Sequence, residues 1–154
     1  MDSTRTYLVV VDDTPESRVA LRYAALRAAT VGARVTLLHG MPAAEFMQWG
    51  GVQEVIQAEA SATAQALLSK LADEVTAAGG ERPSIIVRQG NIIDLVMATV
   101  AADPSIHALV LGAAARGAPG PLIACFAGER AGQLPCLVMI VPGSLSEVRI
   151  ADLS

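Results

Sequence analysis

The sequence predicts a doubly wound α/β fold, a five-stranded parallel sheet with helices on both faces. Apolar segments of strand length alternate with helical segments in the order β-α-β-α-β-α-β-α-β, which is typical of parallel sheets. The strand segments are nearly continuous apolar runs, as expected where both faces of a strand are buried. Hydrophobic residues make up 53% of the chain and aromatic residues only 3%, so the core must be built from Ala, Val, Leu and Ile. We expect the strand order 3-2-1-4-5.

A chain of 154 residues has the length of one domain, which buries roughly 68–70% of the surface that its unfolded form exposes. We expect a single α/β domain over residues 7–143. Residues 1–6 are predicted to be an N-terminal tail and residues 144–154 a C-terminal tail.

The first predicted unit is a strand followed by a helix. Tyr7–Val11 is a continuous apolar run that ends in Asp12 and Asp13, so these acids lie at the carboxyl end of a central strand. Thr14 is suited to the N-cap of the next helix, because its hydroxyl can accept a hydrogen bond from a backbone N–H of the first turn. Gly32 marks the end of that helix.

The later elements follow from the same patterns. Further strands are predicted at Arg34–His39, Ser84–Arg88, Ile106–Leu111 and Leu137–Val141, with helices at Val52–Ala78, between Asn91 and Asp103, and at Leu122–Gln133. The irregular segment Gly40–Gly51 carries Phe46 and Trp49 in a chain that is poor in aromatic residues. We interpret it as a connection that packs on a neighbouring helix or a second subunit. The alternative is a lid over the carboxyl edge of the sheet.

Charge and hydropathy exclude several classes of partner. A net charge of −4 leaves no basic surface for a phosphate backbone, so nucleic acid is not an expected partner. The apolar runs are shorter than the roughly 18 residues of a transmembrane helix, and the N-terminus lacks the pattern of a signal peptide. We therefore expect a cytoplasmic protein without a membrane partner. Cys125 and Cys136 are expected to be free thiols in that reducing compartment.

The carboxyl ends of the central strands are the expected ligand site, because open α/β sheets bind ligands where the strand order reverses. That point lies between strands one and four, so Asp12 and Gly112 are predicted to face each other across a crevice. The loop Ala113–Pro121 follows, and its glycines would let backbone N–H groups approach an anion. Pro119 and Pro121 remove two of those donors, so the loop has the placement of a nucleotide site and only part of its chemistry.

At these positions the chain resembles the universal stress proteins of the UspA type. The resemblance runs from about Tyr7 to Val141 and is carried by five segments: Tyr7–Ala24, Val35–His39, Val87–Gly90, Leu109–Gly112 and Pro135–Val141. It implies a Rossmann-like fold, similar to that of the adenine-nucleotide alpha hydrolases. It also implies a homodimer that pairs through the last strand, Leu137 to Val141.

The resemblance further implies a pocket for ATP or AMP. Asp12 matches the family acid that contacts the adenine end, and Gly40 matches a position that lines the same pocket. Leu111 and Gly112 match the end of the fourth strand, where nucleotide-binding members begin the motif Gly-x2-Gly-x9-Gly-[Ser/Thr].

That motif is broken in this chain. One alignment places the second glycine on Ala115 and the closing pair on Cys125-Phe126, and another uses Gly117 but has Gly128-Glu129 as the nearest Gly-x pair. A third alignment, counted back from Pro135, makes the loop and helix a few residues shorter than the motif requires. A carboxylate at Glu129 would repel a phosphate by about 1 kcal/mol at a separation of about 4 Å in water, and by about 4 kcal/mol at an effective dielectric near 20. No cofactor is therefore assigned firmly, and ATP or AMP is the candidate.

Each candidate residue has an alternative interpretation. Asp12 either accepts from an adenine amino group or is a strand-end carboxylate bonded to nearby backbone amides. Arg116 is the only cation of the loop and either pairs with an anion or is an ordinary surface arginine. Gly112, Gly117 and Gly120 either admit a ligand or are required by the turn itself. His39 lies near the crevice without partners at metal-ligand spacing, so we interpret it as structural.

We predict a non-catalytic, dimeric regulatory protein of the universal stress type, which acts in stress response by binding a protein partner or a small ligand and binds ATP weakly or not at all. The alternative is an AMP- or ATP-binding stress sensor that uses the crevice between strands one and four. A third hypothesis is an enzyme or electron carrier on a flavodoxin-like sheet. The sequence offers it no nucleophile and base, and Asp12-Asp13 would oppose a flavin phosphate after strand one.

Overall fold

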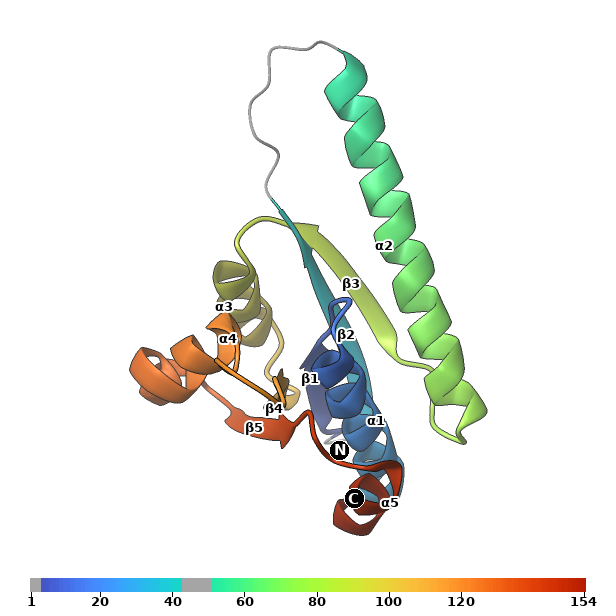
Figure 1. Cartoon of the computed structure of the whole chain (residues 1–154), viewed down its shortest axis with the longest axis vertical. Helices are drawn as coiled ribbons and strands as arrows, with labels where there is room; N and C mark the ends of the chain where they lie inside the picture. The colour runs from blue at the N-terminus through green and yellow to red at the C-terminus, as the bar shows by residue number, and fades with distance from the viewer. Residues whose placement is uncertain (1–3, 43–50) are drawn as a thin grey trace.

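The computed structural model describes residues 4–42 and 51–154 of the chain. Its five strands form one parallel sheet in the order β3-β2-β1-β4-β5, which confirms the predicted fold class (Figure 1). The strands are β1 (Thr6–Val10), β2 (Arg34–Met41), β3 (Ser84–Gln89), β4 (Ile106–Ala113) and β5 (Leu137–Pro142). The two interpretations of the segment Gly40–Gly51 concern mainly residues 43–50, which lie outside the described residues.

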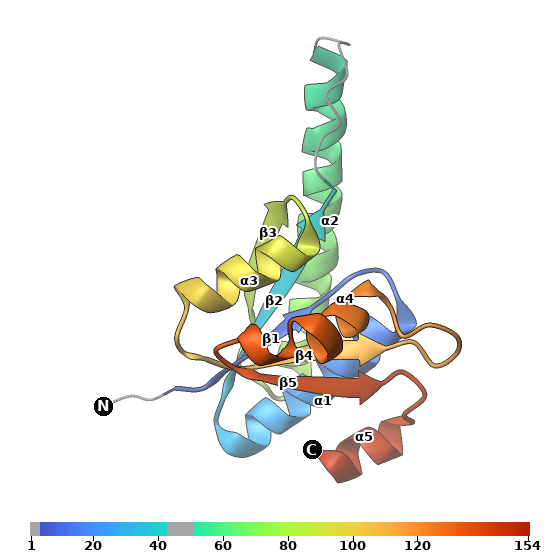
Figure 2. The same cartoon turned by 90° about the vertical axis from the view of Figure 1, so that its left-hand side faces the viewer.

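Helices cover both faces of this sheet. They are α1 (Pro15–Val31), α2 (Gly51–Ala77), α3 (Ile92–Ala102), α4 (Pro121–Ala124) and α5 (Glu147–Leu153). One apolar cluster joins α1 and α2 to the sheet, and a second joins α3 and α4 to the opposite face. Figure 2 shows α3 and α4 on one side of the strands and α1 and α5 on the other.

Successive side chains along a strand point alternately into the two apolar clusters. Leu8 and Val10 of β1 point into the α3 and α4 core, whereas Val9 points into the α1 and α2 core. These side chains are 7% exposed or less, as expected for a central strand with two covered faces. Because β1 pairs with β4 directly, the ends of these two strands are neighbours, and this places Asp12 and Gly112 at the same edge.

The prediction of one continuous helix over Leu122–Gln133 is wrong. Only the single turn of α4 is α-helical; a π-helical turn follows at Cys125–Glu129 and a short 3-10 turn at Ala131–Gln133. Gly128 has φ −113° and ψ −114°, which is incompatible with a continuous helix. The segment still supplies core, since the Phe126 side chain is completely buried.

Residues 144–154, which are predicted to be a C-terminal tail, contain helix α5. Ser146 caps this helix by accepting a hydrogen bond from the Arg149 N–H. Ile150 is 1% exposed, and Glu147 forms an ion pair with Arg22 of α1 at 3.5 Å. A short amphipathic segment of this kind is stable only because α1 offers it an apolar surface.

Helix α2 packs through its carboxyl-terminal half alone. Leu68, Leu71 and Val75 are buried, but Val55 and Ile56 nearer its start are 57% and 59% exposed. Figure 1 shows why: the first turns of α2 extend beyond the edge of the sheet. Over the described part of the chain, no helix combines the length and the apolar character needed to cross a membrane.

Candidate functional site

A cavity of about 280 Å³ lies at the carboxyl edge of the sheet, between the ends of β1 and β4. Four of the predicted site residues line it: Asp12, Gly40, Leu111 and Gly112. Arg116 and Gly117 do not, because they lie on the exposed part of the loop between β4 and α4. The structure therefore brings the predicted adenine-side residues together and leaves Arg116 and Gly117 outside, while Pro119, Gly120 and Pro121 at the end of the same loop line the cavity. We call this cavity, with its lining from Val10 to Ile123, the crevice.

The turn between β1 and α1 is closed by its own hydrogen bonds. Asp12 Oδ1 accepts from the Thr14 N–H at 3.0 Å and also from the Thr14 hydroxyl. Thr14 Oγ1 accepts in turn from the Ser17 N–H, as the predicted N-cap, and Ser17 Oγ accepts from the Asp12 N–H at 3.0 Å. Asp12 is exposed, and Oδ1 carries both of these bonds. Oδ2 is thus the oxygen that remains for a ligand.

Gly112 is required by packing. A Cβ at this position would lie 2.2 Å from the backbone oxygen of Glu16 and 3.1 Å from the Ser17 nitrogen. The first turn of α1 therefore rests directly on the end of β4. Of the two interpretations of this glycine, close approach of the protein's own backbone accounts for it without a ligand.

Gly40 has a similar but softer constraint. A Cβ there would lie 2.8 Å from Ile92 Cδ1 and 3.2 Å from Leu95 Cδ1, both flexible side-chain ends on α3. Gly40 thus lets α3 approach the end of β2, and Ile92 forms part of the crevice wall. The crevice consequently has apolar sides from Ile92, Leu111 and Ile123.

The charged groups of the crevice are acidic. The ionisable side chains that line it in the described structure are the carboxylates of Asp12 and Glu16 and the imidazole of His39. No lysine or arginine is among them. His39 Nδ1 lies 2.8 Å from the Val11 carbonyl oxygen and donates to it. This bond fixes the ring and leaves Nε2 as an acceptor in the neutral tautomer.

Three residues of the loop after β4 offer no free backbone N–H to an anion. The Ala114 N–H donates to the Pro119 carbonyl at 3.4 Å, and Pro119 and Pro121 have no N–H. Helix α4, capped by Gly120 with φ +110°, has a single turn, so it contributes little of the partial positive charge of a longer helix. Glu129 does not line the crevice, so the expected repulsion between its carboxylate and a phosphate has no basis at this site.

Sequence reasoning missed part of the crevice. Ser17, Ile92, Leu122 and Ile123 line it without having been assigned to it. The sequence predicts the helix between Asn91 and Asp103 that carries Ile92, but only the approach of α3 to β2 shows that Ile92 reaches the crevice. The lining as a whole can enclose a planar apolar group and accept hydrogen bonds at one edge, as small-molecule pockets do.

Comparison with known proteins agrees with this geometry. The model of the universal stress protein family matches residues 4–142. Among solved structures, the universal stress protein UspA from Lactobacillus plantarum is 19% identical with a TM-score of 0.69, covering 89% of this chain and 97% of its own. A universal stress protein from Archaeoglobus fulgidus in complex with dAMP is 19% identical, with a TM-score of 0.57 and coverage of 91% and 98%.

An Arabidopsis thaliana universal stress family protein with AMP bound is 16% identical, with a TM-score of 0.62 and coverage of 90% and 91%. These identities support a shared fold. A comparison with curated protein sequences gave no significant match. The family match spans all five strands and includes the crevice residues, and we conclude that the chain belongs to the universal stress protein family.

Proposed function

We propose that this chain is a cytoplasmic, non-catalytic regulatory protein of stress response that works as a dimer and binds AMP in the crevice, with ATP bound weakly or not at all. The observation that carries the proposal is the asymmetry of the crevice lining. Its adenine side retains Asp12 and the apolar walls, while the described part of its lining has no lysine or arginine, and Pro119 and Pro121 carry no N–H. Two relatives of this fold are described with AMP or dAMP bound, which supports a nucleoside monophosphate as the ligand class.

The adenine side has the groups that a purine amino group requires. Asp12 Oδ1 is held by Thr14, so the carboxylate is oriented before any ligand arrives. An exocyclic N–H of adenine donating to Oδ2 would form a charge-assisted hydrogen bond, which is about twice as strong as a neutral one. The walls formed by Ile92 and Leu111 would cover the faces of the purine ring.

The phosphate side favours a small charge. A triphosphate near Asp12 and Glu16 would meet repulsion of about 1–4 kcal/mol per close pair of charges, depending on the effective dielectric. With no lysine or arginine in the described lining to offset this cost, each added phosphate lowers affinity. We therefore expect AMP to bind at least about tenfold more tightly than ATP, a difference of about 1.4 kcal/mol.

Calorimetric titration of the chain with AMP and ATP tests this proposal, and Asp12→Asn sharpens it. In this variant the amide oxygen still serves Thr14, so the second position becomes an NH2 donor that faces the donor of adenine. We expect AMP affinity to fall about tenfold or more while the melting temperature stays nearly unchanged. Asp13→Asn is the matched control, because Asp13 is exposed in the same turn and does not line the crevice.

Equal affinity for ATP and AMP would overturn the charge argument. If Asp12→Asn binds AMP as tightly as the wild type does, Asp12 is not part of the binding site. If no adenine nucleotide binds at millimolar concentration, the remaining function is the binding of a protein partner, and nucleotide sensing is excluded.

The dimer is proposed from the free edge of the sheet. Strand β5 pairs with β4 on one side only, and Figure 2 shows its other side at the front of the molecule. Leu137 and Ile140 of this strand are 72% and 44% exposed. An edge strand with exposed apolar residues favours pairing with another strand, and a second β5 is the partner that gives a closed dimer.

Ile140→Lys tests the dimer, since two lysines would then meet near the symmetry axis of paired β5 strands. Light scattering coupled to gel filtration should give twice the chain mass for the wild type and one chain mass for the variant. Val148→Lys is the control, because Val148 is 73% exposed on α5, away from the edge. A wild type that is monomeric at tens of micromolar would contradict the proposal.

A further inference from the structure

The two carboxylates of the crevice differ in their partners. Asp12 Oδ1 accepts hydrogen bonds from the Thr14 N–H and the Thr14 hydroxyl. Glu16 also lines the crevice and is partly buried, but its side chain forms no hydrogen bond or ion pair within residues 4–42 and 51–154. The negative charge of Glu16 is therefore offset by no described side chain, whereas that of Asp12 is stabilised by two donors.

Glu16 lies beside the ends of β4 and β5. Its backbone oxygen is 2.2 Å from a Cβ built at Gly112, and its own Cβ is 2.9 Å from a Cβ built at Gly143. The Gly143 N–H donates to the Ala113 carbonyl oxygen at 2.8 Å, so the ends of these strands and the first turn of α1 meet at one place. Glu16 is thus fixed at the β4 end of the crevice.

The opposite end of the crevice is formed near β2. Gly40 ends that strand, and Ile92 of α3 packs close to it. A purine that bonds to Asp12 and lies on Ile92 leaves open the part of the crevice beside β4. The sugar and the phosphates of the nucleotide would then extend toward Glu16.

Glu16 also supplies the anion that the start of α1 favours. This helix has 17 residues, so its first turn carries the partial positive charge of a helix N-terminus. Within that turn, Pro15 has no N–H, and the Ser17 N–H already donates to Thr14 Oγ1 at 3.3 Å. The Glu16 carboxylate lies in the same turn and interacts favourably with this end of the helix. A phosphate would have to compete with a carboxylate that is already in place.

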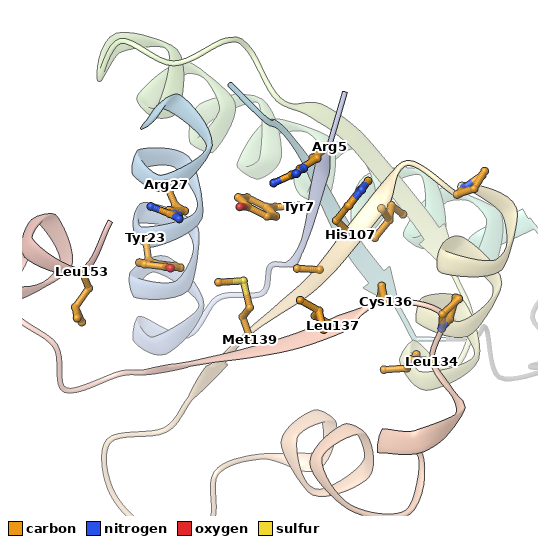
Figure 3. A pocket seen from close by; sticks show the side chains of 14 residues that line it. Arg5, Tyr7, Tyr23, Arg27, His107, Leu134, Cys136, Leu137, Met139 and Leu153 are labelled. Carbon is orange, nitrogen blue, oxygen red and sulfur yellow. The ribbon is translucent and has the colours of Figure 1, made fainter. Parts of the chain in front are cut away.

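Cations that could offset Glu16 lie elsewhere. Arg116 is on the exposed part of the loop after β4 and forms no ion pair within the described residues. Figure 3 shows Arg5 and Arg27 at the opposite edge of the sheet, in a hollow of about 830 Å³ where α1 meets the first residues of β1. That hollow includes Leu137 of β5, which pairs with a second copy in the dimer we propose, so we assign no ligand to it.

We infer that Glu16 determines the preference of the crevice for short phosphate chains, because its carboxylate disfavours ATP more than AMP. Asp12 recognises the base, and Glu16 discriminates the charge of the tail. Coulomb repulsion increases with the charge of the ligand, and ATP carries more negative charge than AMP. Adenosine has no phosphate and does not experience this repulsion. The inference rests on the nucleotide site proposed above.

Glu16→Gln tests the inference, because it removes the charge and keeps nearly the same shape. Calorimetric titration with adenosine, AMP and ATP is carried out in EDTA, so that no divalent cation bridges a carboxylate and a phosphate. We expect ATP affinity to rise at least about fivefold, AMP affinity to rise less, and adenosine affinity to stay within about twofold of the wild type. Glu16→Lys should raise ATP affinity further, to or above that of AMP.

Asp13→Asn is the matched control. It changes the net charge by the same amount as Glu16→Gln, but Asp13 is exposed and does not line the crevice. This control should leave the ratio of ATP to AMP affinity unchanged. Added salt provides a second readout: it should narrow the preference of the wild type for AMP and have less effect on Glu16→Gln, because salt screens charges. A role of Glu16 in shape alone would not produce this dependence.

Three outcomes would overturn the inference: an unchanged ratio of ATP to AMP affinity in Glu16→Gln, an equal gain for adenosine and both nucleotides, or a loss of ATP affinity. If the wild type binds AMP and the ratio is unchanged, the inference fails and the proposed function stands. If the wild type binds no nucleotide but Glu16→Gln or Glu16→Lys binds ATP, the proposed function fails and the inference stands. If no variant binds any nucleotide, both fail.

Discussion

The two connections that border the crevice are built in opposite ways. In the β1–α1 turn, Asp12, Thr14 and Ser17 hydrogen-bond to one another. The β4–α4 connection is long and exposed, and its helix ends after one turn. The first arrangement fixes the orientation of the Asp12 carboxylate, whereas the second contributes apolar core and no lysine or arginine to the described crevice lining. If AMP binds as we propose, the two connections separate recognition of the base from the hold on the phosphates.

The largest effect should come from the core role of the second connection. Phe126→Ala removes a completely buried ring from the α3 and α4 core and should lower the free energy of unfolding by about 3–5 kcal/mol. Urea denaturation measures this. Val148→Ala, at a 73% exposed position, should change it by less than about 0.5 kcal/mol. A small effect at Phe126 would mean that the segment does not form core.

Gly112 tests the contact between the two connections. In Gly112→Ala the new Cβ would meet the Glu16 backbone oxygen at 2.2 Å, and backbone atoms cannot move aside as side chains do. We expect a loss of stability of about 3 kcal/mol. Gly117→Ala, with φ +74° and open space around it, should cost about 1–2 kcal/mol from backbone strain alone. Equal costs would show that α1 does not rest on β4.

Ser17 tests the closed turn itself. Ser17→Ala removes the acceptor of the Asp12 N–H at a site that is 4% exposed, and should cost about 1–2 kcal/mol. Ser144→Ala, in an exposed turn, is the control for thermal denaturation. An unchanged melting temperature for Ser17→Ala would show that the turn holds its shape without this bond.

The smallest effect is expected at Arg116. Since this arginine lies on the exposed loop outside the crevice lining, Arg116→Gln should leave AMP affinity within about twofold of the wild type. Titration calorimetry under the conditions used for Asp12→Asn measures it. A tenfold loss would show that the loop reaches the ligand, and the contrast between the two connections would fail.

Much of this architecture was predictable because its signals are local. The apolar runs of the strands, the Thr14 cap and the stop at Gly32 each depend on neighbouring residues, and the structure has each of them. The Asn91 cap is similar, since its side chain accepts from the Ile93 and Asp94 N–H groups. The alternation of strands and helices then leaves few ways to arrange a parallel sheet.

The form of the segment after α4 and the helix at residues 147–153 were not predictable in the same way. The apolar stretch Leu122–Phe126 predicts a helix by its periodicity. The non-helical backbone of Gly128 and the return of the chain to β5 prevent that helix from continuing to Gln133. Helix α5 has seven residues, too few for a stable helix by itself, so its existence depends on the surface of α1.

The sequence by itself determined the strand order and the placement of Asp12 and Gly112 at one edge, because both follow from the order of the apolar strands and the residues that end them. Only the tertiary structure decided that Gly112 is required by α1 and that Arg116 stays outside the crevice. These depend on how close distant elements approach one another. That distance is set by packing of the whole core, which no single stretch of the chain encodes.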